Sequence, residues 1–226
     1  MIALITHTAG RRLPAPLRRL ATPLRKLSED IAGNSITEFA LILPILITLG
    51  MYGMETAYMA TINMQVSQIA QSVADNGSRM EQTSNSGVSP TVTETDINSV
   101  MTGATLQGAN INLSTRGKVF LSSLEVKPST SPAQQYIHWQ RCTGSYSANS
   151  SYGVEGTVVT NMGNGVTKIT APSGTAVMFA EVHYQYRGLF GSLFVQPMVF
   201  RQEAAVMMRD DRNLTAGLTG TKTAVC

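Results

Sequence analysis

Charged side chains, cysteines and histidines are all scarce in this sequence. Only 14% of its 226 residues are charged, 43% are hydrophobic, and it has two cysteines and three histidines. The histidines, His7, His138 and His183, are scattered, so no pair has the close spacing of a zinc site. Nucleophile-elbow, phosphate-loop and paired-histidine motifs are also missing. The sequence therefore predicts neither an enzyme nor a protein with a metal or another cofactor.

Positive charge is concentrated before Gly33. Six cationic residues stand there against Glu29 and Asp30, a surplus of four, so a total charge of +3 leaves about −1 for the rest of the chain. A basic arm directly before an apolar segment stays in the cytoplasm and sends the following chain outward. A nucleic-acid-binding arm is the alternative, but no basic or aromatic platform follows it. We therefore expect a cytoplasmic leader over residues 1–33 and no nucleic-acid partner.

A long apolar segment follows the basic leader. Phe39–Met54 contains sixteen residues without a formal charge. A helix needs about 20 mostly apolar residues to cross a bilayer, and residues 36–57 supply them. A secretory signal is the rival interpretation, but this run is long, begins late and is not closed by an Ala-x-Ala site. We expect one membrane-spanning helix, with the following domain outside the cytoplasm.

Helical periodicity continues beyond the apolar run. Apolar residues recur at intervals of three and four, at Ile62, Val66, Ile69, Ala70 and Val73. Asn76-Gly77 is a suitable left-handed stop. We therefore predict a transmembrane and extended helix over residues 34–77.

Glu38 stands at the start of this apolar run, five residues along when Asn34 is counted as one. The simplest interpretation is a charge at the headgroup level. However, Gly33-Asn-Ser-Ile-Thr-Glu-Phe-Ala-Leu-Ile-Leu-Pro-Ile-Leu, with the later Gly53-Met-Glu55 step, resembles the TadE/TadG-like pseudopilins of the tight-adherence (Flp) pilus system. The likeness continues weakly through Trp139-Gln-Arg-Cys142 and the Tyr184-Gln-Tyr186 strand to Arg201-Gln202. Asn34 differs from the phenylalanine with which many type IV pilins begin.

This resemblance implies a minor pilin or pseudopilin that is cut between Gly33 and Asn34. It also implies a single-pass protein of a bacterial inner membrane or a pilus, with a cytoplasmic N-terminus and a periplasmic or otherwise extracytoplasmic C-terminal domain. The implied partners are a prepilin peptidase, other pseudopilins and the major pilin, the inner-membrane assembly platform and membrane lipid. Glu38 would pair with the new amino terminus of a neighbouring subunit and set the register between subunits, a documented use of buried ion pairs. The alternative is an uncleaved, signal-anchored envelope protein whose domain binds a ligand or scaffolds other proteins.

Glu55 is open to two interpretations. It is either a solvated charge at the outer membrane interface or a second registry residue that contacts another pseudopilin helix. Gly50 and Gly53 lie on nearby turns and permit close helix approach.

The rest of the chain has the pattern of a mixed domain. Residues 78–94 read as a polar linker, and residues 95–226 as an extracytoplasmic domain. A short helix begins with Thr93 or Thr95 as its cap, and Ile97, Val100, Met101 and Leu106 form its buried side. Strands follow at Lys118–Val126, Gln135–Cys142, Thr175–Tyr186 and Phe194–Met208. We predict a pilin-like α+β fold, with the long helix packed on an antiparallel sheet.

Two cysteines remain, Cys142 at the end of a predicted strand and Cys226 at the last position. In an outward-facing compartment such a pair most naturally forms one disulfide. It would hold a Gly- and Thr-rich tail that otherwise frays. Two free thiols are the alternative.

Overall fold

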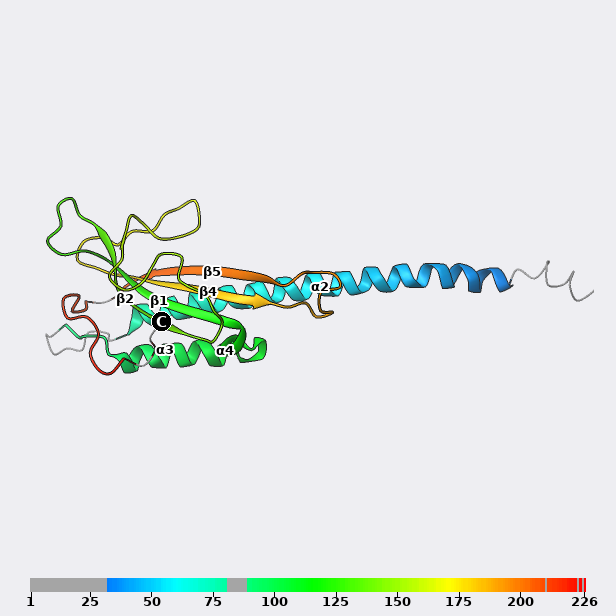
Figure 1. Ribbon diagram of the computed structural model, residues 1–226, viewed down its shortest axis with the longest axis horizontal. Coiled ribbons are helices and arrows are strands. Elements are labelled where there is room, and N and C mark those ends of the chain that lie inside the picture. Colours follow the sequence, from blue (N-terminus) through cyan, green and yellow to red (C-terminus); the bar gives the residue numbers. More distant parts are fainter. Residues whose placement is uncertain (1–31, 81–88, 210, 223, 225) are drawn as a thin grey trace, which may run out of the picture. The chain divides into compact units, whose positions relative to one another are not determined.

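A single helix forms the N-terminal part of the described chain. The computed structural model describes residues 32–80, 89–209, 211–222, 224 and 226. Helix α2 runs without interruption from Ala32 to Arg79, over 48 residues, and contains Pro44 (Figure 1). The leader over residues 1–31 lies outside the described residues. The chain divides into two compact units, one ending at Tyr52 and one, called the head below, running from Gly53 to Cys226.

The helix ends later than the sequence predicts. It passes through Asn76 and Gly77 and ends at Arg79, so the predicted stop at residue 77 is wrong. Gly77 serves a different purpose, because a Cβ at this position would lie 3.3 Å from both terminal methyl groups of Leu121. The glycine allows the helix to approach the sheet closely instead of supplying a left-handed turn.

The head contains one five-stranded antiparallel sheet. Its strands are β1 (Gly117–Val126), β2 (Gln135–Thr143), β3 (Val158–Val159), β4 (Val177–Tyr186) and β5 (Met198–Met207), in the order β3-β2-β1-β4-β5 (Figure 1). The four long strands coincide with the four predicted ones, within four residues at each end. The α+β prediction is thereby confirmed, whereas the short strand β3 was not predicted.

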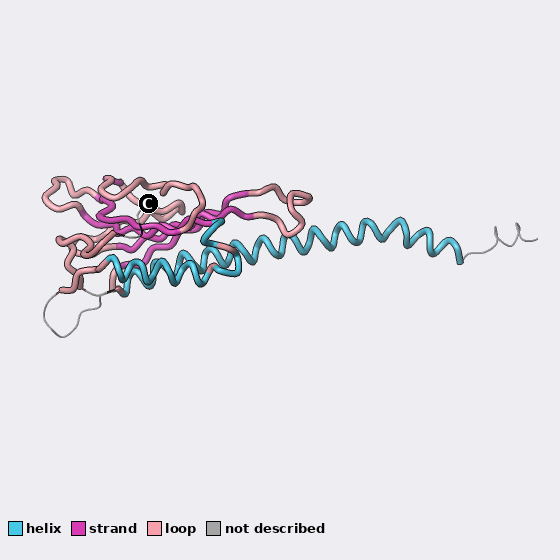
Figure 2. Tube along the Cα trace, turned by 60° about the horizontal axis from the view of Figure 1, so that its bottom comes forward, coloured by secondary structure: helices cyan, strands magenta, loops and turns pink. Residues whose placement is uncertain are grey.

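Helices cover one face of this sheet. The head's part of α2 and helix α3 (Glu94–Gln107) lie on the same side of the strands (Figure 2). One continuous core joins them to alternate residues of the sheet, including Ile69 and Val73 of α2, Ile97 of α3, Leu121 of β1 and Ala180 of β4. Since strand side chains alternate between faces, Val177 and Phe179 belong to a second core on the opposite face. The predicted packing of the helix on the sheet is present.

Helix α3 begins with a capping box. Thr93 accepts a hydrogen bond from the Asp96 backbone, 3.2 Å long, and the Asp96 carboxylate accepts one from the Thr93 backbone, 3.0 Å long. Thr93, not Thr95, is therefore the cap, and Glu94 belongs to the helix instead of the predicted linker. Leu106 is 71% exposed, contrary to prediction. It lies nine residues after buried Ile97, about two and a half turns, and so faces the opposite way.

The connection between α3 and β1 contains two short helices. These are η1 (Ala109–Ile111) and α4 (Leu113–Arg116), separated by Asn112 in a left-handed conformation. Tyr184 of β4 donates a hydrogen bond to the Ile111 carbonyl over 2.8 Å. This contact fixes the connection against the sheet.

Candidate functional site

The proposed processing site lies at the start of α2. Gly33 and Asn34 belong to the helix, which begins at Ala32. Glu38 follows about one helical turn after Asn34, and its side chain is exposed. The structure thus places all three residues in one helical segment, and a cut after Gly33 would leave the remainder of α2 attached to the head. Processing itself stays a prediction.

The first unit presents an apolar helix surface. Large hydrophobic side chains between Ile36 and Met54 are exposed, with fractions from 38% at Leu43 to 75% at Leu41. Within the described residues, one helix is long and apolar enough to cross a membrane, with a mean hydropathy of 1.7 in its most apolar window. By length and composition it is a candidate membrane anchor or signal sequence.

Glu55 occupies a site that the sequence did not predict. Its side chain is only 1% exposed and lies inside the head. Tyr186 donates a hydrogen bond from its hydroxyl to Oε1 over 2.6 Å, and the backbone N–H groups of Leu189 and Phe190 donate over 3.2 and 3.1 Å. The prediction of a solvated charge at Glu55 is therefore wrong. A registry role remains untested, but these three donors within the chain already satisfy the carboxylate.

Gly188 permits this arrangement. A Cβ at Gly188 would lie 2.4 Å from the Gly191 carbonyl oxygen and 2.7 Å from Glu55 Oε1. Any side chain here would therefore displace the loop from the carboxylate. Burial and the adjacent Glu55 carboxylate raise the pKa of Tyr186, so this hydroxyl keeps its proton and acts as a donor.

Glu55 was missed because its partners come from residues 186–190, more than 130 positions later. The available signal was weak: a carboxylate at the end of an apolar run, and a Gly-Leu-Phe-Gly turn in a distant apolar stretch. Nothing in either pattern indicates that the two meet.

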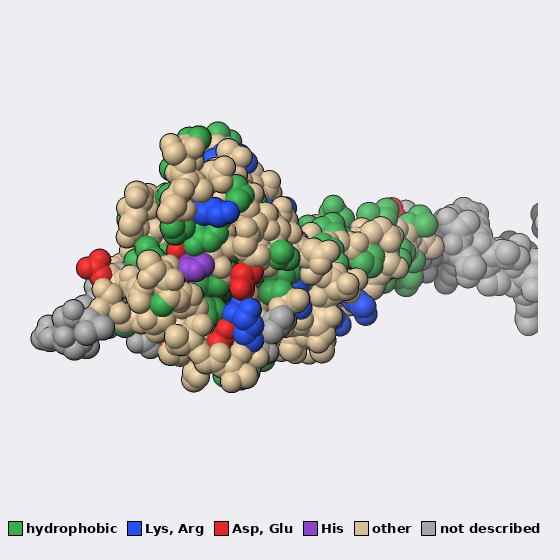
Figure 3. All heavy atoms as spheres, turned by 60° about the vertical axis from the view of Figure 1, so that its left-hand side comes forward, with side chains coloured by type: hydrophobic (Ala, Val, Ile, Leu, Met, Phe, Trp, Pro, Cys, Tyr) green, Lys and Arg blue, Asp and Glu red, His purple; other side chains and the backbone are tan. Residues whose placement is uncertain are grey.

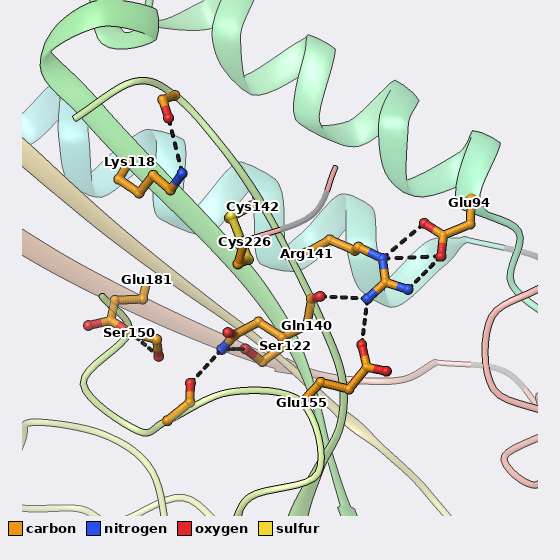
Figure 4. The surroundings of a disulfide bond; sticks show 12 residues. Glu94, Lys118, Ser122, Gln140, Arg141, Cys142, Ser150, Glu155, Glu181 and Cys226 are labelled. Carbon is orange, nitrogen blue, oxygen red and sulfur yellow. Dashed lines mark hydrogen bonds and ion pairs between the residues drawn. A yellow bond between two sulfur atoms is a disulfide. The ribbon is translucent and has the colours of Figure 1, made fainter. Parts of the chain in front are cut away.

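A second buried cluster surrounds the cysteines. The sulfurs of Cys142 and Cys226 lie at disulfide distance, with their Cα atoms 5.2 Å apart (Figure 4). Beside Cys142, the Arg141 guanidinium is 3% exposed. It donates from Nε to Glu94 Oε2 over 2.9 Å and from one amino group to Glu155 over 2.6 Å. The cluster therefore joins β2 to α3 next to the point where the C-terminal residue is held.

A third cluster lies on the face of the sheet opposite the helices. Glu181 is 1% exposed and accepts hydrogen bonds from both Ser150 and Ser151, while His183 and Arg201 contact it over 2.6 and 3.0 Å. Burial alone would raise the pKa of Glu181, but the hydrogen bonds from His183 and the serines lower it.

The same cluster includes Tyr152 and Glu203. Burial, followed by the hydrogen bond to Glu203, raises the pKa of Tyr152 to about 12. This group was missed as well, although the pairing of Glu181 with Glu203 and of His183 with Arg201 follows from the β4–β5 register. Each charged group in this cluster has an opposite charge or a hydrogen-bonding partner, but the buried Arg201 Nε, 3.0 Å from a Glu181 oxygen, makes no hydrogen bond of good geometry.

One face of the head carries little charge of either sign. Figure 3 shows one face on which uncharged atoms predominate and charged side chains stand in small groups. Among the residues that the structure describes, no three His, Cys, Asp or Glu side chains are placed to hold a metal ion.

Comparisons with protein-family models, with curated proteins and with solved structures found no match. The fold and its sites define an α+β protein with a long apolar helix at its N-terminal end. Three features bear on its function: the apolar helix surface of the first unit and, in the head, the Glu55 site and the paired cysteines.

Proposed function

We propose that this chain is a minor pilin or pseudopilin of a Tad (Flp) type IV-like pilus assembly or secretion system. The N-terminal motif from Gly33 to Leu46 supports the proposal, together with one structural observation. Helix α2 is unbroken. Most of its large apolar side chains are exposed up to Met54, and from Ile62 onward one of its faces is buried in the head's core. One helix can therefore serve as both membrane anchor and structural core, as a subunit drawn from a membrane into an assembly requires.

In this proposal a prepilin peptidase cuts the precursor after Gly33 on the cytoplasmic side of the inner membrane. Asn34 then carries a new, positively charged amino group. Glu38 follows about one turn later and pairs with the amino terminus of a neighbouring subunit, so that both charges enter lipid together. A lone carboxylate in the hydrocarbon would cost about 2–3 kcal/mol, which gives the pairing a driving force.

The head then lies outside the cytoplasm, where Cys142 and Cys226 form a disulfide. Fellow pseudopilins, the major pilin and the membrane platform of the assembly machine are its partners. The protein acts through assembly and not through catalysis.

The decisive experiment is the intact mass and N-terminal sequence of the membrane-extracted chain, produced with and without its host's prepilin peptidase. We expect a chain that begins at Asn34 only when the peptidase is present. Gly33→Val should block the cut. Gly50→Ala is the matched control, because a Cβ at Gly50 has no atom within 4 Å, and it should leave the cut unchanged.

Two results would contradict the proposal. A chain that begins at Met1 in both hosts identifies an uncleaved anchor, and the head is then an envelope domain that binds a ligand or scaffolds other proteins. A peptidase-independent cut after the apolar run identifies a secretory signal.

A further inference from the structure

The connection between β4 and β5 is apolar and exposed. Gly188–Phe200 contains thirteen residues without a charge, between Arg187 and Arg201. Two large apolar side chains of the connection face solvent, Leu189 (49% exposed) and Leu193 (69%), as do Met198 (41%) and Val199 (47%) at the start of β5. Several large apolar side chains exposed within one short segment are typical of an interaction site.

This segment has a fixed position along α2. Glu55 accepts hydrogen bonds from the backbone N–H groups of Leu189 and Phe190. Glu55 is also the first charged residue after the sixteen uncharged residues Phe39–Met54. The loop is therefore attached to the helix at the residue where the candidate membrane span ends.

The loop is also internally organised. Gly188 and Gly191 close its first turn, with 3.2 Å between the Gly191 nitrogen and the Gly188 oxygen, and Gly191 has a φ of +67°. The rings of Phe190 and Phe194 meet edge to face, with centroids 6.0 Å apart. These contacts leave Leu193 outermost among the loop's apolar side chains, because it is the most exposed of them.

We propose that residues Gly188–Pro197, the interfacial loop, lie in the headgroup–acyl boundary of the bilayer that α2 enters. Leu189 and Leu193 would contact acyl chains there, as the apolar faces of interfacial segments do. Arg187 is exposed at the base of the loop and would extend its guanidinium to lipid phosphates. The occupant of this surface is thus lipid, and the head rests on the membrane through two elements instead of one.

Three features of the loop favour lipid over a protein partner. The loop carries no charge that would select a partner, its base carries a cation suited to phosphate, and Glu55 holds it at the end of the apolar run. The inference rests on the membrane anchoring in the proposed function, and it is independent of cleavage after Gly33 and of entry into a pilus.

The test uses the full chain in lipid nanodiscs at one copy per disc. Tryptophan is introduced as Leu193→Trp, and its fluorescence is compared in ordinary lipid and in lipid with brominated acyl chains. Trp139 is 6% exposed and present throughout, so the parent chain supplies its signal for subtraction. Val166→Trp is the matched control, because Val166 is fully exposed on a different loop of the head, and Leu46→Trp reports the anchor itself.

We expect brominated lipid to reduce the Leu193→Trp signal about twofold or more and to leave the Val166→Trp signal unchanged. If brominated lipid quenches Leu46→Trp but not Leu193→Trp, the proposed lipid contact of the interfacial loop is wrong, whereas the membrane anchor is retained. Protection of Leu193→Trp from aqueous iodide only in discs that hold several copies also overturns the lipid contact, because it assigns the loop to a second copy. If Leu46→Trp is not quenched either, both the membrane anchoring and the lipid contact of the loop are wrong. Cleavage after Gly33 is tested separately, by the mass of the chain.

Discussion

At the scale of single residues, Glu55 connects the long helix to the far end of the sheet. Its carboxylate is buried, and each of its three donors comes from the end of β4 or from the loop after it. A buried carboxylate without donors would cost several kcal/mol. The hydrogen bonds therefore make the position of residues 186–190 depend on one side chain of α2.

Removing one of these donors should weaken the head. Tyr186→Phe deletes the hydroxyl that donates to Glu55 over 2.6 Å but keeps the ring against Phe200. We expect the free energy of unfolding to fall by about 1.5–3 kcal/mol, the usual value of a hydrogen bond to a charged group. Denaturant unfolding of the full chain in detergent measures it.

Tyr58→Phe is the control for this change, because Tyr58 is 37% exposed and its ring also packs on Tyr186. It should alter the free energy of unfolding by less than about 0.5 kcal/mol. Equal losses of unfolding free energy in the two variants would show that the hydrogen bond to Glu55 contributes no more to stability than the hydroxyl of Tyr58 does.

His138 is the residue at which pH should affect stability. It lies in a β-bulge, since Ser123 pairs with Trp139 and Leu124 pairs with Ile137. Its Nδ1 lies 2.9 Å from Glu125 Oε2, and Ser123 donates to the other oxygen over 2.6 Å. The hydrogen bond to Glu125 is the main cause that raises the pKa of His138, against the opposing effect of burial.

A raised pKa stabilises the fold while the imidazole is protonated. This contribution is complete below the unfolded pKa of about 6.5 and is lost as the pH rises through the higher folded pKa. We therefore expect the urea midpoint to fall as the pH rises from about 6.5 through the folded pKa, with His138→Gln removing that part of the slope.

Ser123→Ala is the control, because it removes a hydrogen bond to the same carboxylate without removing a titrating group. It should lower the urea midpoint by a similar amount at every pH. An unchanged pH slope in His138→Gln would rule out this pair as the source of the pH dependence.

At the scale of elements, Arg141 connects α3 to the sheet. It comes from β2, and its main partner Glu94 is the first residue of α3 and is 4% exposed. The outer partner, Glu155, is half-exposed and also lies 3.4 Å from Lys222. Arg141 therefore has a buried ion pair with Glu94 and a partly solvated one with Glu155. The two should contribute very differently to the free energy of unfolding.

Arg141→Met should lower the free energy of unfolding by about 3–5 kcal/mol, because it leaves the Glu94 charge buried without its partner. The double variant Arg141→Met/Glu94→Met should recover most of this loss, since two apolar side chains of similar volume replace the pair. Thermal and denaturant unfolding of the full chain measure both.

Lys222→Met is the matched control on the solvated side. It should change stability by less than about 1 kcal/mol, as for other exposed ion pairs. A double variant as unstable as Arg141→Met alone would show that the destabilisation comes from repacking and not from an unpaired charge.

At the scale of the whole molecule, sequence periodicity was enough to predict the long helix, its core-facing residues and the four long strands. Each of these elements has one face toward the core, so its period is present in the sequence. Asn76-Gly77 was misread because the close approach of Gly77 to Leu121 is a tertiary contact. The Glu55 site and the Glu181 network were missed for the same reason: their members meet only after the sheet has formed.

The pairing of Cys142 with Cys226 could be predicted from the sequence because it contains only two cysteines. By contrast, the role of Glu38 depends on other subunits, and neither periodicity nor the fold of one chain tests it. The role of Glu38 must therefore be tested by measuring how the chain behaves in an assembly with other subunits.

Glu38→Ala should therefore separate processing from assembly. The peptidase acts at Gly33, so we expect a mature chain that still begins at Asn34 and retains the stability of the head. Without the carboxylate, the amino terminus of a neighbouring subunit enters lipid unpaired, at a cost of about 2–3 kcal/mol. Because about 1.4 kcal/mol corresponds to a tenfold change in an equilibrium constant, incorporation into pili or cross-linked complexes should fall about tenfold or more. Thr48→Ala is the control, because the hydrogen bond that the Thr48 hydroxyl donates to the Pro44 carbonyl over 2.7 Å lies within the helix itself. Normal assembly of the cleaved Glu38→Ala chain would mean that the helix is an anchor alone, and the registry role would have to be abandoned even if cleavage is confirmed.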